Sequence, residues 1–234
     1  MRKIIFMGAC LLMASGALSA STAFTVYGTG FDSSGNLLTT AGSSDGNFTL
    51  TVNPDGIDSN AYLVDSIAFP LGGSWVANDT LSAWIGPQSG SSIGLPGVYT
   101  YQESFDLTAY DPSTAQITGQ LAADDSVEVF LNGVDTGSGA PGYSAEIFLN
   151  GVDTGISASS VNSRTAINIV SGFNPGVNTL TVVVKNVPET SGNPTGLFAE
   201  LAGGSTVPEP ASFAFIGLGL AALGFLPLRR RLRS

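Results

Sequence analysis

The stretch GVYTYQESFDL, residues 97–107, decides the fold class, because aromatic and polar residues alternate along it. In an extended chain Tyr99, Tyr101 and Phe105 fall on one face together with Glu103, and the residues between them fall on the other. A period of two residues is the pattern of a β-strand that buries one face. We therefore expect a long strand here, as part of a β-sandwich.

Other strand patterns lie on both sides of this stretch, each short and each bounded by turn residues. Turn residues such as Asn-Pro-Asp-Gly at 53–56 separate them, and no amphipathic helix pattern stands out. The sequence therefore predicts an all-β fold, a β-sandwich over residues 24–204. The expected strand regions are 24–27, 48–52, 61–69, 115–121, 166–170 and 178–186.

A hairpin sequence occurs twice. SVEVFLNGVDTG at residues 126–137 recurs as SAEIFLNGVDTG at residues 144–155, with ten of the twelve positions identical. Asn-Gly between alternating apolar residues is the strongest short hairpin pattern, and a single repeat is too few for a solenoid. We expect one copy to lie in the sheet and the other to form an added hairpin or a long excursion, and the sequence leaves open which copy does which.

A resemblance narrows the fold further. From residue 97 on, the chain presents an aromatic strand, Ala-Asp-Asp, a strand ending in Leu-Asn-Gly, the sequence Gly-Val-Asn-Thr-Leu before a valine-rich strand, and Asn-Pro-Thr-Gly. This order resembles the galactose-binding-like jelly roll, the sandwich of many carbohydrate-binding modules. The resemblance covers residues 75–201 and implies a jelly-roll β-sandwich, a fold that hosts binders, enzyme appendages and inert spacers alike.

The first 23 residues have the pattern of a secretory signal peptide. Arg2 and Lys3 precede an apolar run at 4–18, and small residues follow it. The small-residue rule favours cleavage after Ala23, with cleavage after Ala20 as the alternative. The only cysteine of the chain lies in this leader, so the mature protein has no thiol nucleophile and no cysteine metal site.

The last residues, 205–234, form a tail in three parts. Val-Pro-Glu-Pro at 207–210 precedes an apolar segment at 211–228, which is just long enough to cross a bilayer core of about 30 Å as a transmembrane helix. A basic end at 229–233 follows and is expected to stay in the cytoplasm. The basic residues are Arg229, Arg230, Arg231 and Arg233.

This tail closely resembles the PEP-CTERM sorting tail of Gram-negative bacteria. The resemblance implies that an exosortase, a membrane cysteine protease, recognises Pro208, Glu209 and Pro210 and cuts there. The helix and the arginines then serve as a retention handle that is removed. The implied route runs from an inner-membrane-anchored precursor to the cell envelope or the extracellular matrix.

The predicted body is strongly acidic. Residues 24–206 contain 17 Asp or Glu against two basic residues, Arg164 and Lys185, a net charge of −15. Such a surface repels nucleic acid and anionic lipid and suits divalent cations. The chain has no histidine, which excludes a Ser-His-Asp triad and removes the commonest transition-metal ligand.

Two sets of residues are candidates for binding. Trp75, Trp84, Tyr99 and Tyr101 are candidates for a platform on which a sugar ring stacks, although such aromatic residues in a small all-β domain are more often core. Oxygen ligands on turns are candidates for one structural Ca²⁺, which related jelly rolls often hold. The candidate calcium ligands are Asp45, Asn47, Asp55, Asp58, Asp124 and Asp125.

Catalytic motifs are scarce. A glycosidase needs two carboxyl groups about 5–9.5 Å apart across a cleft. Asp124 and Asp125 are neighbours on a predicted strand and are expected to point to opposite faces, so they do not form such a pair by themselves. No phosphate-binding loop is present, and we expect no enzyme.

The sequence therefore favours an exported, non-enzymatic envelope or matrix protein, structural or adhesive and associated with exopolysaccharide. A dedicated carbohydrate-binding module with an aromatic sugar platform is the alternative, and a glycoside-active envelope enzyme is a third hypothesis. The expected partners are exosortase, extracellular polysaccharide, and the membrane through the C-terminal helix before cleavage, with no nucleic acid.

Overall fold

The computed structural model describes residues 21–207, except residues 57, 68, 69, 72, 126–129, 132, 133, 136–144, 159, 190 and 191. Strands dominate this part, and its one helical element is a short 3-10 turn, η1 (Pro112–Thr114). The strands are β1 (Ser21–Thr22), β2 (Ser44–Val52), β3 (Asn60–Leu63), β4 (Ile85–Gly86), β5 (Gly97–Asp106), β6 (Gln116–Asp124), β7 (Phe130–Leu131), β8 (Val134–Asp135), β9 (Ala145–Leu149), β10 (Val152–Ala158), β11 (Thr165–Ile169), β12 (Val177–Asn186) and β13 (Gly196–Thr206).

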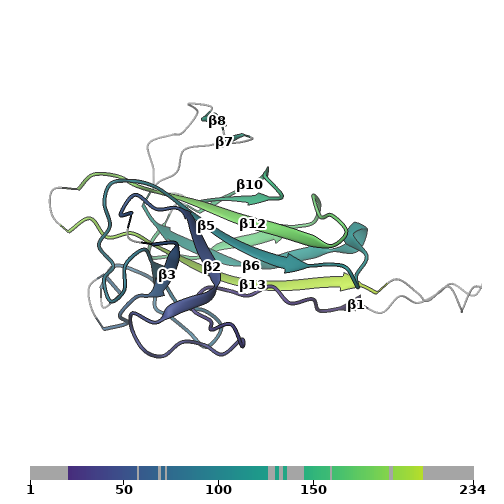
Figure 1. Cartoon of the computed structure of the whole chain (residues 1–234), viewed down its shortest axis with the longest axis horizontal. Coiled ribbons are helices and arrows are strands. Elements are labelled where there is room, and N and C mark those ends of the chain that lie inside the picture. Colours follow the sequence, from purple (N-terminus) through teal and green to yellow (C-terminus); the bar gives the residue numbers. More distant parts are fainter. Residues whose placement is uncertain are drawn as a thin grey trace, which may run out of the picture. The chain divides into compact units, whose positions relative to one another are not determined.

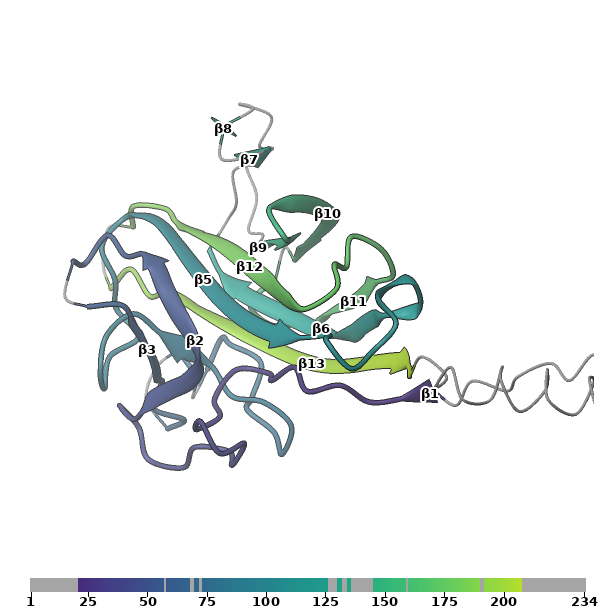
Figure 2. The ribbon, with the colours of Figure 1, turned by 45° about the vertical axis from the view of Figure 1, so that its right-hand side comes forward.

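The strands pair antiparallel and form two layers (Figures 1 and 2). β10, β9, β12, β5 and β2 lie side by side in the β5 layer, and β4, β13, β6 and β11 in the β6 layer. β3 pairs with both β2 and β4 and so joins the layers at one edge. From β5 onward the chain passes back and forth between the layers, with β9 and β10 entering the β5 layer together, which is the winding of a jelly roll. The predicted all-β jelly-roll sandwich is confirmed.

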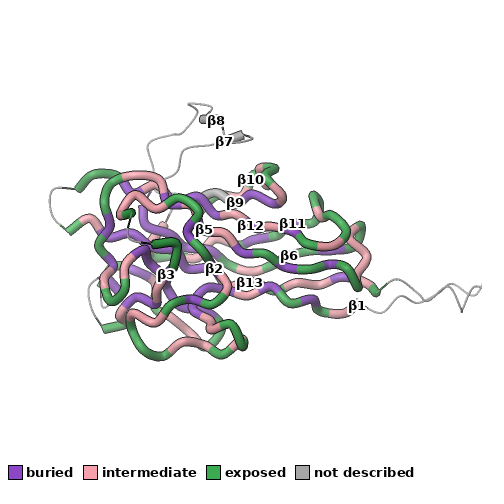
Figure 3. The backbone as a smooth tube through the Cα atoms, viewed as in Figure 1, coloured by how far each residue is buried: buried purple, intermediate pink, exposed green. Residues whose placement is uncertain are grey.

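β5 is a central strand because both its edges and its inner face are occupied. It pairs with β12 in an unbroken register from Gly97↔Asn186 to Asp106↔Val177. Its inner residues are buried in the main core between the layers, and its outer residues alternate with them (Figure 3). The alternation that predicted the strand is thus the alternation between core and surface. Core residues facing β5 include Ile117, Leu121, Ala123, Leu180, Val182, Leu197 and Ala199.

A second, smaller apolar cluster covers the outer side of the β6 layer. Ala122 and Phe198 alternate along their strands with residues of the main core, and Trp75 and Trp84 pack on this outer side. The two indole rings stack with centroids 4.0 Å apart. The guanidinium of Arg164 lies 4.3 Å from the ring centroid of Phe198. The loops that carry the tryptophans are therefore fixed to the β6 layer.

The duplicated hairpin occupies two different places. β9 and β10 belong to the second copy, and β9 pairs with β12 from Leu149↔Leu180 to Ala145↔Val184. β7 and β8 belong to the first copy and pair with each other in a separate two-stranded sheet. The second copy therefore fills the place beside β12, which answers the question that the sequence left open.

Two expected strands differ from the prediction. Residues 24–27 form no strand, because the Tyr27 N–H donates to the carboxylate oxygen Oε1 of Glu103, at 2.7 Å, instead of to a neighbouring strand. The strand expected at 61–69 is shorter in the structure, where β3 ends at Leu63 and turn residues follow at 66 and 67.

The predicted signal peptide, residues 1–23, lies mostly outside the described residues. Its last part forms β1, which pairs antiparallel with the end of β13. Cleavage after Ala23 removes this pairing, whereas cleavage after Ala20 keeps it.

The sorting triplet Pro208, Glu209 and Pro210, the predicted transmembrane segment at 211–228 and the basic end at 229–233 all lie outside the described residues. Within the part of the chain that the structure describes, no helix has the length and hydropathy needed to cross a membrane.

Candidate binding face on the β5 layer

Every second residue of β5 faces away from the main core. Val98 and Thr100 come first along this outer side, and Gln102, Ser104 and Asp106 follow. The outer side of the strand therefore changes from apolar to polar along its length. Two hollows lie along β5, one beside the apolar part of its outer side and one beside the polar part.

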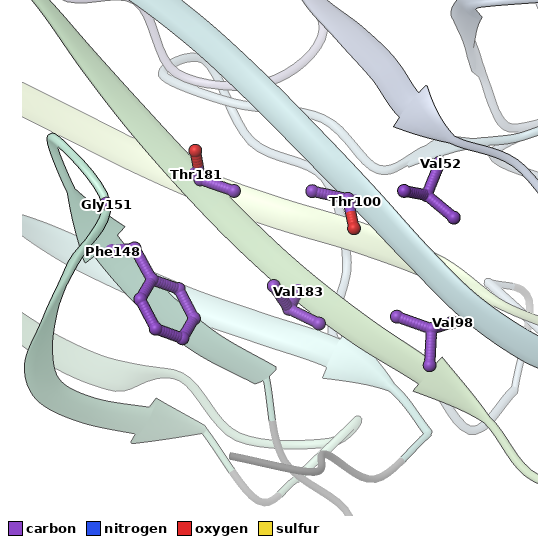
Figure 4. A pocket seen from close by; sticks show the side chains of 7 residues that line it. All are labelled: Val52, Val98, Thr100, Phe148, Gly151, Thr181 and Val183. Atoms are coloured by element: carbon purple, nitrogen blue, oxygen red, sulfur yellow. The ribbon is translucent and has the colours of Figure 1, made fainter. Parts of the chain in front are cut away.

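The apolar hollow has a volume of about 440 Å³ and draws its lining from neighbouring strands (Figure 4). Phe148 and Val183 are buried in its floor, whereas Val52 at its rim is 49% exposed. The floor is thus fixed by packing and the rim stays open to solvent. The lining residues are Val52, Val98, Thr100, Phe148, Gly151, Thr181 and Val183.

The polar hollow has a volume of about 400 Å³ and lies where β2 diverges from β5. The register between these strands runs only from Val52↔Thr100 to Thr49↔Gln102, so the second half of β5 is not paired with β2. Hydroxyl, amide and carboxyl groups line the space, with the ring of Tyr27. The lining residues are Thr25, Tyr27, Gly46, Asn47, Thr49, Gln102, Glu103, Ser104, Phe105 and Asp106.

Gln102 connects the two hollows. Its Nε2 donates to Oγ1 of Thr181, which lines the apolar hollow, at 3.3 Å. Its backbone carbonyl accepts from Oγ1 of Thr49 at 3.4 Å. Apolar surface and hydrogen-bonding groups therefore adjoin on one face, an arrangement that can take a ligand with apolar C–H faces and many hydroxyl groups.

Glu103 points inward from the same strand, and within the described part of the chain only one of its two carboxyl oxygens has a hydrogen-bond partner. Its Oε1 accepts from the Tyr27 N–H, and its Oε2 is buried with no hydrogen-bond partner among the described residues. Burial, with the nearby charge of Asp45, raises the pKa of Glu103 to about 8. Asp106 points to the opposite side of β5 and accepts from Thr108. The two carboxyl groups of the polar hollow therefore do not converge on one point as a glycosidase pair does.

The predicted aromatic platform is wrong in this structure, because its four residues are buried. Trp75 and Trp84 lie in the cluster outside the β6 layer, and Tyr99 and Tyr101 lie in the main core. The two pairs are on opposite sides of the β6 layer, so they form no common surface. Their apolar rings contribute to packing, and none is open to a sugar.

The buried polar atoms of these rings are mostly paired within the body. Trp75 Nε1 donates to Oδ2 of Asp124 at 2.6 Å, and Trp84 Nε1 donates to a backbone carbonyl at 2.7 Å. Burial and the hydrogen bond to Asp55 raise the pKa of the Tyr99 phenol. These contacts explain why the rings are held inside.

The expectation that Asp124 and Asp125 point to opposite faces is also wrong. β6 ends at Asp124, so the strand alternation stops there. The side chains of Asp124 and Asp125 hydrogen-bond to each other, and burial together with this contact raises the pKa of Asp124. Asp125 Oδ2 accepts from the Val187 N–H at 3.0 Å. Both carboxyl groups are buried and line neither hollow. Their hydrogen bonds connect the end of β6 to the loops that contain Trp75 and Val187.

The six candidate calcium ligands are not gathered in one place. Asp45, Asp55 and Asp58 each accept hydrogen bonds from N–H or O–H groups of their own surroundings. Asn47 donates from Nδ2 to a backbone carbonyl, and the remaining two ligands form the buried acid pair. Across the described residues, no three Asp, Glu, His or Cys side chains form a group that could hold a metal ion.

Sequence reasoning missed Phe148, Thr181 and Val183 as residues of an open face. The alternation of β5 indicated an outer side, but it did not reveal which strands flank it. Phe148 had an identical counterpart in the first hairpin copy, so its place beside β12 could not be assigned from sequence.

Comparison with known proteins gives one strong match and one weak one. The model of the PEP-CTERM protein-sorting motif matches residues 206–231. No curated protein matches the chain. Among solved structures, the chain is similar to the CBM36-1 domain of a multidomain xylanase from the hindgut metagenome of Trinervitermes trinervoides, with 11% sequence identity and a TM-score of 0.27. This alignment covers 59% of this chain and 90% of that domain, and a TM-score so low does not establish a common fold.

The motif match agrees with the three-part tail that the sequence presents: a Pro-Glu-Pro triplet, an apolar segment and an arginine cluster. Residues 206–231 of this chain are a PEP-CTERM protein-sorting motif, which indicates an exported protein sorted to the cell envelope.

Proposed function

We propose that this protein is a structural or adhesive, non-enzymatic component of the envelope or extracellular matrix of a Gram-negative bacterium. The sorting motif at residues 206–231 carries the proposal. An exosortase cuts the precursor at Pro208, Glu209 and Pro210 and so separates the body from its membrane helix. The carboxyl groups of Glu103 and Asp106 lie on opposite sides of β5, and those of Asp124 and Asp125 are buried and line neither hollow, which supports a role without catalysis.

The triplet is the part to test first. Replacement of Pro208, Glu209 and Pro210 by alanine removes the proposed recognition sequence and leaves the apolar segment and arginines in place. We expect the variant to remain in the membrane fraction at full length, whereas the wild type appears shortened in the envelope or the medium. Ser212→Ala is the matched control and is expected to be processed normally. A triple variant that is shortened like the wild type contradicts the proposal.

A second candidate function is glycan binding on the outer side of the β5 layer. The observation that favours it is the junction of an apolar hollow with a polar one along a single strand. Apolar side chains suit the C–H faces of a sugar ring, and the amide of Gln102 with the hydroxyls around it suits the sugar hydroxyls. The acidic body favours a neutral polysaccharide over an anionic one.

Affinity gel electrophoresis in neutral polysaccharides, with xylan and galactan as first probes, tests this candidate. Thr181→Arg places a long charged side chain between the two hollows, and Thr118→Arg places the same side chain on the exposed side of β6. We expect the polysaccharide to slow the wild type and Thr118→Arg but not Thr181→Arg. Equal mobility of all three, with or without polysaccharide, excludes glycan binding for these probes without affecting the sorting proposal.

A further inference from the structure

The β9–β10 hairpin lies beside β12 and is held there by contacts of its own residues. These contacts depend on the residue types of the hairpin and not on its position along the chain. Ile147 and Leu149 are buried in the main core. Asn150 lies at the turn with φ 51°, and Gly151 follows with φ 77°, the left-handed pair that an Asn-Gly hairpin turn requires. Thr154 Oγ1 donates to the Ile147 carbonyl at 2.8 Å across the hairpin.

Asn150 also anchors the hairpin to its neighbours. Its Oδ1 accepts from the Thr179 N–H at 3.0 Å, and its Nδ2 donates to Asn178 Oδ1 and to the Gly172 carbonyl, each at 2.8 Å. One side chain is therefore bonded both to β12, at Asn178 and Thr179, and to the loop that contains Gly172. Any hairpin with the same residues in the same register can make them.

The first copy has those residues. Leu131, Asn132, Gly133 and Thr136 stand 18 positions before their counterparts, and Val129 replaces Ile147. Its strands also pair in the same local register. Phe130↔Asp135 and Leu131↔Val134 in β7–β8 correspond to Phe148↔Asp153 and Leu149↔Val152 in β9–β10.

The chain also has the length to place the first copy beside β12. In the register shown, 20 residues connect β6 to β9 and six connect β10 to β11. A shift by one repeat makes these connections two and 24 residues long. Three Cα steps after Asp124 then span about 10 Å, which is the separation of two packed sheets. Lengthening one loop while shortening the other changes the closure entropy only slightly.

We propose that the two hairpin copies exchange within one chain for the place beside β12, so that the folded body exists in two registers 18 residues apart. The second copy is favoured because Ile156, which packs against the main core, has the polar Ser138 as its counterpart, and because Ile147 has one more methylene than Val129. The Ile147 methylene alone contributes a factor of about two to ten to this preference. The copy that does not pair with β12 lies in the connection that follows β6 in one register and in the connection that precedes β11 in the other.

Two cysteine pairs distinguish the registers. Val183 is the β12 partner of Glu146, and Glu128 is the counterpart of Glu146 in the first copy. In the full-length exported protein carrying Cys10→Ser, V183C is combined with E146C or with E128C. Oxidation followed by non-reducing electrophoresis and peptide mass mapping identifies the disulfide and whether it lies within one chain.

We expect an intramolecular disulfide in both combinations, with the E146C product formed faster. Adding Ile147→Val should raise the initial rate of the E128C disulfide by about two- to tenfold, because it removes the part of the preference that the Ile147 methylene supplies. T118C with E128C is the control for random collision, since Thr118 lies on β6. An E128C–V183C pair that oxidises no faster than this control, or that gives only disulfide-linked dimers, overturns the proposal.

Discussion

Glu103 is the residue at which folding and protonation are most strongly linked. The folded protein holds its proton up to about pH 8, whereas the carboxyl group in the unfolded chain has the ordinary pKa of 4.5. The stabilisation from this proton is therefore complete below about pH 4.5 and is lost as the pH rises through 8. Asp124 titrates in the same direction, so the body is expected to lose stability as the pH rises from about 4.5 to about 8.

Glu103→Gln tests this linkage, because glutamine keeps the acceptor for the Tyr27 N–H and has no proton to lose. We expect the variant to melt about 3 °C or more above the wild type near pH 9 and close to it near pH 5. Thermal melts by circular dichroism across this range provide the measurement. Asp106→Asn is the control, because the pKa of exposed Asp106 is lowered and its titration ends below neutral pH. Parallel curves for the wild type and Glu103→Gln contradict the assignment.

Asn178 is a second residue whose role is local and measurable. It is fully buried, its Oδ1 accepts from Asn150 and from the Asn174 N–H, and its Nδ2 donates to the carbonyls of Asn174 and Gly176. Asn178→Ala leaves these groups without partners and should lower the free energy of unfolding by about 2–4 kcal/mol. Exposed Asn168→Ala should change it by less than about 0.5 kcal/mol, as measured in urea titrations. A similar loss in both variants refutes the network's contribution.

At the scale of elements, the strands with the clearest alternation were predictable and the loops around them were not. Residues 97–107 became β5, because the alternation matched one buried and one open face. The segment at 24–27 alternates as well, but its Tyr27 N–H is taken by Glu103, 76 positions away. The tryptophan residues were placed in a platform because sequence could not show that their loops fold over the outer side of β6.

The hairpin duplication permits a test at the same scale. Deletion of residues 138–155 leaves the first copy, and deletion of 126–143 leaves the second, with identical connections to β6 and β11. We expect both shortened proteins to melt cooperatively. The two shortened proteins differ only by Val127 in place of Ala145 and Val129 in place of Ile147, so we expect their free energies of unfolding to lie within about 1.5 kcal/mol of each other. Differential scanning calorimetry provides the comparison, and a broad, non-cooperative transition in either protein would show that both copies are needed.

At the scale of the whole molecule, the C-terminal tail was the most predictable part of the chain and the candidate binding face the least. The tail combines a Pro-Glu-Pro triplet, an apolar segment and an arginine cluster, and its motif match confirms the sorting prediction. The face on the β5 layer combines residues of β2, β5, β9 and β12, and the order of these strands is set by pairing across the chain. No local sequence pattern indicates the order of these strands in the sheet.

The mass of the exported protein tests the processing of both ends together. We expect an N-terminus at Ser21, because Ser21 and Thr22 pair with β13, and a C-terminus between Val207 and Pro210. Intact mass spectrometry of protein from cells and medium measures both. An N-terminus at Thr25 or Phe24 contradicts the role assigned to β1, and a mass that extends to Ser234 shows a retained membrane anchor.

β13 ends at Thr206, the first residue of the sorting motif, and pairs with β6 in register from Gly196↔Asp124 to Gly204↔Gln116. A mechanical pull on the tail therefore enters the body along the axis of this strand. All the hydrogen bonds between β13 and β6 then bear the load at the same time, in shear, and do not break one after another. If the mature protein is attached to the cell at this point and has the proposed adhesive role, its body bears force along β13.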